Sequence, residues 1–206
     1  MKLVIIGAGG HGQVVADAAI AAGFEVLGFL DDDRALLGKQ FLGVSVLGPI
    51  EAARDMDASC VVAIGDNRHR KQVVDQLGFP AQHYAAVIHP RAIVSPYAEV
   101  LPGAMVLAGA VVGPQAVVGS HSIINHASSI DHHDIVGAFV HVAPGCHAGG
   151  NVRIGDGAFL GVGVSVVPGA TVGKWATVGA GSVVLRDVPE ATVVAGVPAR
   201  ELRKGE

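Results

Sequence analysis

The sequence predicts two folds in succession, a small α/β domain over residues 1–82 and a left-handed parallel β-helix over residues 83–206. Two observations support this prediction. At the start of the chain, a short apolar run, a glycine-rich turn and a helical pattern follow one another, as in a Rossmann-like βαβ unit. From Ile88 to Val184, a six-residue period of mostly branched apolar residues continues without a slip, as in a hexapeptide solenoid.

In the first domain, short apolar runs alternate with stretches of helical periodicity. We expect strands at residues 3–6, 25–30, 44–47 and 61–64, and helices at 14–22 and about 68–77. Residues 80–87, which begin with a proline, should form the hinge to the second domain. This order predicts a compact βαβ-type domain.

In the second domain, every sixth residue from Ile88 to Val184 is Val, Ile or Leu, except Ala148. In most repeats a small residue follows four positions later. The exceptions to that rule are Asp134, Val140, Val152 and Val164. Each hexapeptide should form one short strand and one turn, with the branched residue pointing inwards and three hexapeptides closing a triangular coil. Flat faces and open coil ends favour self-association.

Glycine directly follows the branched residue in many repeats. Positive φ or close backbone approach at the turn would each explain this choice. The glycines concerned are Gly113, Gly119, Gly137, Gly155, Gly161, Gly173 and Gly179.

The composition narrows the possible functions. The 206 residues are 4% aromatic and carry a formal charge of −4, so no basic surface points to nucleic acid or to an anionic membrane. Cys60 and Cys146 have no zinc-like spacing and should be free thiols in a reducing compartment. No apolar segment is long enough for a signal peptide or a membrane span. We expect a cytoplasmic, soluble protein.

The turn after the first predicted strand reads GAGGHG and satisfies G-x-G-x-x-G with Gly7, Gly9 and Gly12. This pattern predicts a phosphate or nucleotide cradle at a helix N-terminus, and a purely structural turn is the alternative. Because the domain is too short for a complete dinucleotide fold, we expect a nucleotide-linked substrate rather than NAD. The candidate substrate-binding residues are Gly9, Gly10, His11, Gly12, Asp31, Asp32, Gly65, Asp66 and Asn67.

The segment NHASSIDHHDIVGAFVHV, residues 125–142, contains four of the ten histidines. His132 and His141 fall outside the inward-pointing positions. Asp131 and Asp134 flank His132 within reach of fixing an imidazole tautomer, which is how a general base is usually supported. A merely solvated polar face is the alternative.

A zinc site shared between chains is another possibility, because His121 and His126 are spaced as in the β-helical carbonic anhydrases. The third ligand of such a site would come about two coils earlier, where this chain has Ala85. We therefore expect no metal.

Together these motifs resemble the bacterial hexapeptide-repeat sugar acetyltransferases. That family includes N-acetyltransferases of the bacillosamine and perosamine pathways and sialic-acid O-acetyltransferases. The resemblance rests on VIIGAGGHG at 4–12, AIGDN at 63–67, the histidine segment and AGVPAR at 195–200. It implies a homotrimer with active sites between neighbouring prisms, acetyl-CoA along the coil groove, and a nucleotide sugar held by the N-terminal domain.

The resemblance also implies residue roles. His132 matches the general base, and Asn125 matches the contact to the acceptor amine. Family members usually have an acid directly after the base, where this chain has His133, so Asp131 or Asp134 is the expected orienting carboxylate, with Asp131 favoured. The candidate acetyl-CoA contacts are His141, Gly149, Gly150, Gly161, Gly179, Ala180 and Pro198.

We therefore expect an enzyme that transfers acetyl from acetyl-CoA directly to the 4-amino group of a nucleotide-linked 4-amino-4,6-dideoxy sugar. Backbone N–H groups of Gly149 or Gly150 would stabilise the oxyanion. Two alternatives stay open. A sialic-acid-type O-acetyltransferase would use the same base, and a non-enzymatic trimeric scaffold that binds nucleotide sugars would need none.

Overall fold

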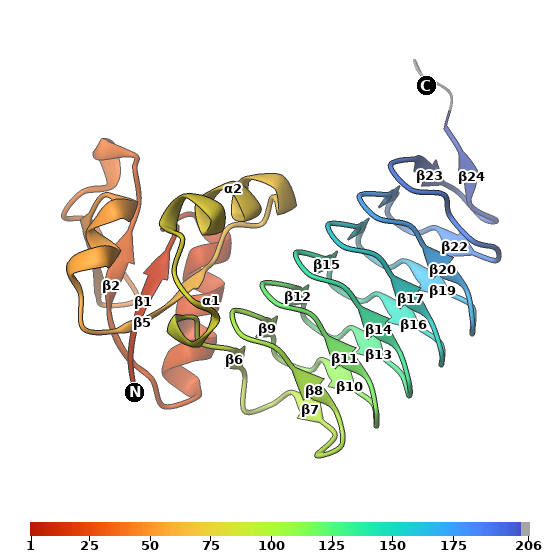
Figure 1. Ribbon diagram of the computed structural model, residues 1–206, viewed down its shortest axis with the longest axis horizontal. Coiled ribbons are helices and arrows are strands. Elements are labelled where there is room, and N and C mark those ends of the chain that lie inside the picture. The colour runs from red at the N-terminus through yellow and green to blue at the C-terminus, as the bar shows by residue number, and fades with distance from the viewer. Residues whose placement is uncertain (203–206) are drawn as a thin grey trace.

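The protein consists of an α/β domain and a long triangular prism that extends from it (Figure 1). This computed structural model describes residues 1–202; residues 203–206 of the predicted second domain lie outside the described part. Within residues 1–202, no helix has the length and apolar character needed to span a bilayer.

A five-stranded sheet in the order β3-β4-β2-β1-β5 forms the centre of the first domain. All neighbouring strands are parallel except β3 and β4. The strands are β1 (Lys2–Ile6), β2 (Glu25–Leu30), β3 (Gln40–Phe41), β4 (Val44–Gly48) and β5 (Ser59–Val62). The helices are α1 (Gly10–Ala21), η1 (Arg34–Leu36), η2 (Ile50–Asp55), α2 (Asn67–Leu77) and η3 (Ala81–His83).

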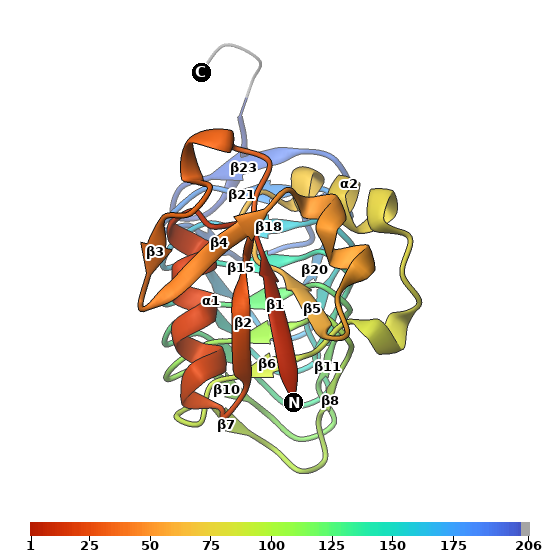
Figure 2. The same ribbon diagram turned by 90° about the vertical axis from the view of Figure 1, so that its left-hand side faces the viewer.

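Each face of this sheet has its own apolar core. Leu3 and Ile5 pack with helix α1 and with the first coils of the prism, whereas Val4 and Ile6 pack with α2 and η2. The sheet therefore separates two helical layers (Figure 2). Helix α1 lies between the sheet and the prism (Figure 1).

The predicted elements of this domain are confirmed, with two shifts. The fourth strand covers 59–62 instead of 61–64, and the first helix begins at Gly10 instead of residue 14. The early start depends on Gly12, because a Cβ there would lie 2.0 Å from the carbonyl oxygen of Gly7. Glycine thus lets the first helical turn pack directly on the end of β1.

The prism has three parallel sheets, which we call its first, second and third faces in the order in which the chain visits them. The first face contains β6 (Val87–Ile88), β9 (Met105–Val106), β12 (Ile123–Ile124), β15 (His141–Val142), β18 (Phe159–Leu160), β21 (Thr177–Val178), β23 (Val193–Ala195) and the antiparallel β24 (Arg200–Glu201). The second face contains β7 (Ile93–Val94), β10 (Val111–Val112), β13 (Ser129–Ile130), β16 (His147–Ala148), β19 (Ser165–Val166) and β22 (Val183–Val184). The third face contains β8 (Glu99–Val100), β11 (Val117–Val118), β14 (Ile135–Val136), β17 (Arg153–Ile154) and β20 (Thr171–Val172).

The second residue of each short strand points into the prism. From Val106 to Val184, all of these side chains are buried in one continuous core, which confirms the register predicted from the six-residue repeat. Three corners connect the faces. The first corner joins the first face to the second face, and the second corner joins the second face to the third face. The third corner joins the third face to the first face of the next coil. Equivalent positions in successive coils lie eighteen residues apart, as with His141, Phe159 and Thr177.

The glycines that follow the branched residues owe their place to close packing of successive coils. None of the seven has positive φ, and a Cβ on Gly119 would lie 2.4 Å from the backbone of Gly137 one coil on. Positive φ recurs instead two residues later, from Gly103 to Gly181, and includes non-glycine residues such as Gln115 and His133.

Asp134 departs from the small-residue rule because its side chain forms hydrogen bonds to the backbone at the second corner. It is fully buried, and its carboxylate oxygens accept hydrogen bonds from the backbone N–H groups of Asp131 and Val152, each at 2.8 Å. Ser122 accepts from the N–H of Val140 in the same way. Two of the four exceptions, Val140 and Val152, thus lie directly above a polar side chain.

The buried carboxyl of Asp134 should make stability depend on pH. Burial raises its pKa from 3.8 to about 6, against the opposing effect of two N–H donors. A raised folded-state pKa contributes stability that is complete below pH 4 and is lost as the pH rises through 6.

When the pH is lowered from 7 to 4, we expect the free energy of unfolding of the wild type to rise relative to that of Asp134→Asn. The relative rise should be at most about 3 kcal/mol. Urea unfolding of both proteins at several pH values measures this difference, because the contributions of the shared histidines cancel. A difference that is independent of pH would contradict the prediction.

Candidate active site

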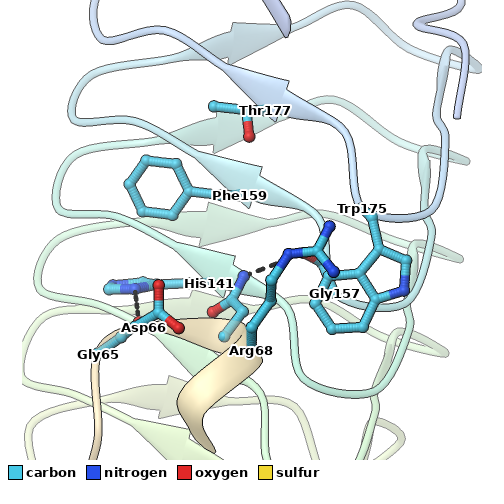
Figure 3. A pocket seen from close by; sticks show the side chains of 9 residues that line it. Gly65, Asp66, Arg68, His141, Gly157, Phe159, Trp175 and Thr177 are labelled. Carbon is cyan, nitrogen blue, oxygen red and sulfur yellow. Dashed lines mark hydrogen bonds between the residues drawn. The ribbon is translucent and has the colours of Figure 1, made fainter. Parts of the chain in front are cut away.

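Two neighbouring pockets contain most of the predicted substrate-binding residues, one within the α/β domain and one where that domain meets the prism. The first, of about 340 Å³, is lined by the glycine-rich turn together with Asp31, Asp32 and His69. The second, of about 490 Å³, lies between residues 65–68 and the first face of the prism (Figure 3). Gly65 lines both pockets, so they adjoin.

The first pocket gathers most of the substrate-binding residues predicted from the sequence. Gly9, Gly10, His11 and Gly12 lie at the start of α1, where the helix dipole favours negative charge. The two aspartates hold the surrounding loops: Asp31 accepts from the N–H of Ala8 at 2.8 Å, and Asp32 accepts from the N–H of Ile50 at 2.9 Å.

The second pocket has one wall on the prism and one on the α/β domain. His141, Phe159 and Thr177 stand in one column on the first face, and Asp66 and Arg68 face them from the start of α2 (Figure 3). Asp66 caps this helix by accepting from the N–H of His69 at 2.7 Å.

The hydrogen bonds of His141 fix its tautomer. Its Nδ1 lies 3.1 Å from the carbonyl oxygen of Gly65, which can only accept, so Nδ1 carries the hydrogen. Its Nε2 then accepts from the side-chain amide of Asn125 at 3.2 Å, and the Asn125 oxygen accepts from the N–H of His126 at 2.8 Å. Burial lowers the pKa of His141 to about 4, so the ring is neutral at pH 7.

His11 lies beside this group, with its ring centre 6.0 Å from that of His141. Burial, followed by the nearby His141 and Arg70, lowers the pKa of His11 to about 3. Its Nε2 is buried and has no hydrogen-bond partner among residues 1–202. A neutral, polar group therefore lies at the junction of the two pockets.

Arg70 of helix α2 joins the two domains. Its side chain is fully buried, and its guanidinium donates to the carbonyls of His121 at 2.7 Å, Phe139 at 3.0 Å and Val140 at 3.2 Å on the prism. Within the α/β domain it donates to the carbonyl of Ile64 at 2.7 Å. These carbonyls replace the carboxylate that usually accompanies a buried arginine.

The rest of the first turn of α2 continues this docking along the third corner. The Asn67 amide donates to the carbonyls of Gly157 at 3.1 Å and Ala158 at 3.0 Å. One coil further on, the Arg68 guanidinium lies over the Trp175 ring, 4.6 Å from its centre. Positions 121, 139, 157 and 175 are successive equivalents, so the helix start contacts four coils in order.

His132 lies away from both pockets, at the second corner between β13 and β14, and is exposed. Its ring rests on Gly150 of the next coil, where a Cβ would come within 2.4 Å of Cε1 and Nε2. The structure therefore brings His132 together with Gly150, but not with His141 or Asn125.

Neither predicted carboxylate holds the His132 ring. The Asp131 carboxylate accepts from the backbone N–H of His132 at 2.6 Å, and Asp134 is occupied by the backbone groups described above. The Nδ1 of His132 lies instead 3.0 Å from the Nδ1 of His133. Both carboxylates therefore bind the backbone of the turn and not the ring.

Apart from His141 on the first face, the predicted acetyl-CoA contacts lie at the first corner, after β23 and at the second corner. Gly161, Gly179 and Ala180 line the first corner, in or beside the column that contains Asn125, and Pro198 follows β23. Gly149 and Gly150 lie at the second corner with His132. The N–H of Gly149 donates to the carbonyl of Val166 at 3.0 Å, so Gly149 does not fit the predicted role of oxyanion donor.

The two histidines considered for zinc lie at different corners. His121 is buried at the third corner, stacked on Phe139 with ring centres 5.1 Å apart and edge-on to Tyr84 at 4.6 Å, whereas His126 lies at the first corner. In the described residues, no three His, Cys, Asp or Glu side chains are grouped to hold a metal ion.

Sequence reasoning missed Arg70, Arg68, Phe159 and Trp175. Trp175 offered a signal, because it is the single tryptophan of a chain with few aromatic residues. Arg70 offered none, because it belongs to the polar run NRHRKQ and the prism carbonyls that it contacts lie more than fifty positions away.

Two family models match the chain. Residues 2–77 match the PglD N-terminal domain, and residues 151–186 match the bacterial transferase hexapeptide (six repeats). The chain is also 35% identical over 96 residues to UDP-N-acetylbacillosamine N-acetyltransferase of Bacillus subtilis (strain 168), an alignment that spans 43% of each chain.

Solved structures resemble the chain over nearly its whole length. The acetyltransferase domain of PglB from Neisseria gonorrhoeae FA1090, in complex with acetyl coenzyme A, is 40% identical over 98% of both chains, with a TM-score of 0.91. A histidine-to-alanine mutant of GDP-perosamine N-acetyl transferase from Caulobacter crescentus, in complex with CoA and GDP-perosamine, is 36% identical over 99% of this chain and 98% of the other, with a TM-score of 0.91.

The burial of Arg70 predicts that two arginines of one helix turn differ sharply in their effect on stability. Arg70→Met leaves several buried carbonyls without donors and should lower the free energy of unfolding by about 3 kcal/mol. The control Arg68→Met removes an exposed cation and should cost less than about 1 kcal/mol. Chemical denaturation measures both, and equal losses would contradict the assignment of Arg70.

Proposed function

Because the chain belongs to the PglD family of hexapeptide-repeat N-acetyltransferases, we propose that it transfers the acetyl group of acetyl-CoA to the 4-amino group of a nucleotide-linked 4-amino-4,6-dideoxy sugar. The observation that supports this most directly is the pair of adjoining pockets. A glycine-rich turn at a helix N-terminus, suited to a nucleotide phosphate, opens beside a groove on the prism that contains the neutral His141.

The relatives support the choice of substrates. The curated relative and the structure from Caulobacter crescentus are N-acetyltransferases of amino sugars, and the structures bind acetyl coenzyme A, or CoA with GDP-perosamine. In this chain, Gly9, Gly10, Asp31 and Asp32 would hold the nucleotide, and Gly65, Asp66 and Asn67 would border the sugar.

Acetyl-CoA would lie along the first face of the prism. His141, Gly161, Gly179 and Ala180 line this path, and Pro198 lies beyond it. The amide of Asn125 gives one hydrogen to His141 and keeps the other for a ligand. His11, whose Nε2 has no partner among residues 1–202, would contact the acceptor at the junction.

The proposed site would need a second copy of the chain. His132 and Gly150 lie at the second corner, whereas one pocket lies within the α/β domain and the other at the first face. A homotrimer, in which the second corner of one prism faces the groove of its neighbour, would complete three equivalent sites.

His132 would act as general base in a direct transfer. The acceptor nitrogen attacks the thioester carbon, forming the C–N bond and an oxyanion, while Nε2 of His132 takes the N–H proton. The intermediate then re-forms the carbonyl and breaks the C–S bond, and the departing CoA thiolate takes the proton from Nε2 of His132 to become the thiol, which leaves His132 neutral again. The N–H of Gly150 stays a candidate for stabilising the oxyanion.

The reaction itself can be tested by mass spectrometry. Purified protein and acetyl-CoA are incubated with UDP- and GDP-linked 4-amino-4,6-dideoxy hexoses, CMP-sialic acid and free sialic acid. We expect one added acetyl group on an amino sugar, together with release of CoA thiol. Acetylation confined to sialic acid, or no transfer to any acceptor, would overturn the proposed function.

The sharing of each site between copies can be tested by complementation. His132→Ala and His141→Ala should each lower kcat, the former by on the order of 10²- to 10⁴-fold. In a co-expressed mixed trimer, a site is intact where two conditions are met. Its groove comes from a His132→Ala chain, which keeps His141, and its second corner comes from a His141→Ala chain, which keeps His132.

Equal co-expression should therefore restore about a quarter of wild-type activity. The control is a freshly made mixture of the separately purified variants, which contains only homotrimers and should stay inactive. If the co-expressed protein shows no recovery, His132 and His141 act within one chain.

A further inference from the structure

The side-chain partner of His132 is its neighbour His133. Their Nδ1 atoms lie 3.0 Å apart, and the two rings stand nearly perpendicular at 87°. Two nitrogen lone pairs do not face each other favourably at this distance, so one Nδ1 carries a hydrogen and the other accepts it. The pair is thus a hydrogen bond whose direction decides what His132 can do.

No other titratable group competes for this nitrogen in the surrounding coils. Within the turn, Asp131 and Asp134 are hydrogen-bonded to backbone N–H groups. The adjacent turns of the coils before and after contain Gly113, Pro114 and Gln115, and Gly149, Gly150 and Asn151. None of these six residues has an ionisable side chain.

The two possible directions differ in their chemistry. If His133 donates, the Nδ1 lone pair of His132 is occupied and its Nε2 carries the hydrogen, so His132 has no lone pair for a substrate proton. If His132 donates, its Nε2 keeps the lone pair. Only the second direction survives when His132 takes up a proton, because an imidazolium donates from both nitrogens and accepts at neither.

We propose that His133 is the positioning residue for His132: its Nδ1 accepts the Nδ1–H of His132 and thereby leaves the His132 Nε2 lone pair free to take the acceptor's proton. This rests on the proposed function of His132 as general base. A neutral imidazole at this place does what a carboxylate does in a Ser-His-Asp triad, holding the tautomer and stabilising the imidazolium, but without a negative charge.

The backbone at position 133 suits this role and suits its test. His133 has φ of 60°, and its N–H donates to the carbonyl of Pro114 at 3.1 Å. The corresponding positions of two later hexapeptides are occupied by Phe139 and Trp175, with φ of 57° and 56°. An aromatic ring without an acceptor is therefore compatible with this backbone, and His133→Phe keeps the shape while removing the hydrogen bond.

The test compares His133→Phe and His133→Asp in the wild-type and His132→Ala backgrounds. We expect His133→Phe to lower kcat by on the order of tenfold to a hundredfold, with unchanged KM for acetyl-CoA and unchanged melting temperature. His133→Asp should restore kcat and move the acid limb of its pH profile to higher pH, because a carboxylate favours the protonated form of His132. In the His132→Ala background neither substitution should change the residual rate.

A readout without substrate separates this proposal from the function on which it rests. ¹⁵N correlation spectra of the histidine rings should show the Nδ1–H tautomer at His132 in the wild type and its loss in His133→Phe. Wild-type kcat in His133→Phe, an equal loss in the His132→Ala background, or an Nε2–H tautomer at His132 in the wild type would each overturn the proposal. If the tautomer is as expected but no acetyl transfer occurs, the proposed function fails and the pairing stands.

Discussion

The hydrogen-bonded ladder between successive coils is the constraint on which the rest of the structure depends. Each coil adds eighteen residues, and backbone groups such as the N–H of His141 and the carbonyl of Ala158 bond across the step. Equivalent positions therefore form straight columns, and a functional side chain gains neighbours one coil above and below. The column of His141, Phe159 and Thr177 and the seating of His132 on Gly150 both follow from this register.

The same ladder gives the α/β domain a regular surface on which to dock. The corner carbonyls at positions 121, 139 and 157 face helix α2, so Arg70 and Asn67 each find acceptors without any carboxylate. The two ion pairs in residues 1–202, Lys71 with Asp75 and Lys174 with Asp156, are exposed and contribute little to stability. Docking thus depends on buried donors that meet backbone carbonyls, which fixes Gly65 against His141.

Burial also separates the histidines into two kinds. His11 and His141 are neutral because burial disfavours their charged forms, and they suit contacts to a ligand. His132 and His133 stand exposed at the second corner. The proposed general base at the second corner therefore lies apart from the proposed ligand contacts on the first face and on helix α1, and the proposed trimer would bring them together.

The sequence by itself determined the two-domain order, the inward-facing residues of the prism and most helix and strand positions, because each follows from a local period or a short motif. It also placed the glycine-rich turn, His132 and His141 among the candidate site residues. The tertiary structure alone decided that Arg70 is buried, that Asp134 caps a backbone corner rather than orienting His132, and that His132 and His141 lie on different parts of the prism. These outcomes depend on contacts one coil or more than fifty residues apart, and the side chains that make them carry no distinguishing pattern in the sequence around them.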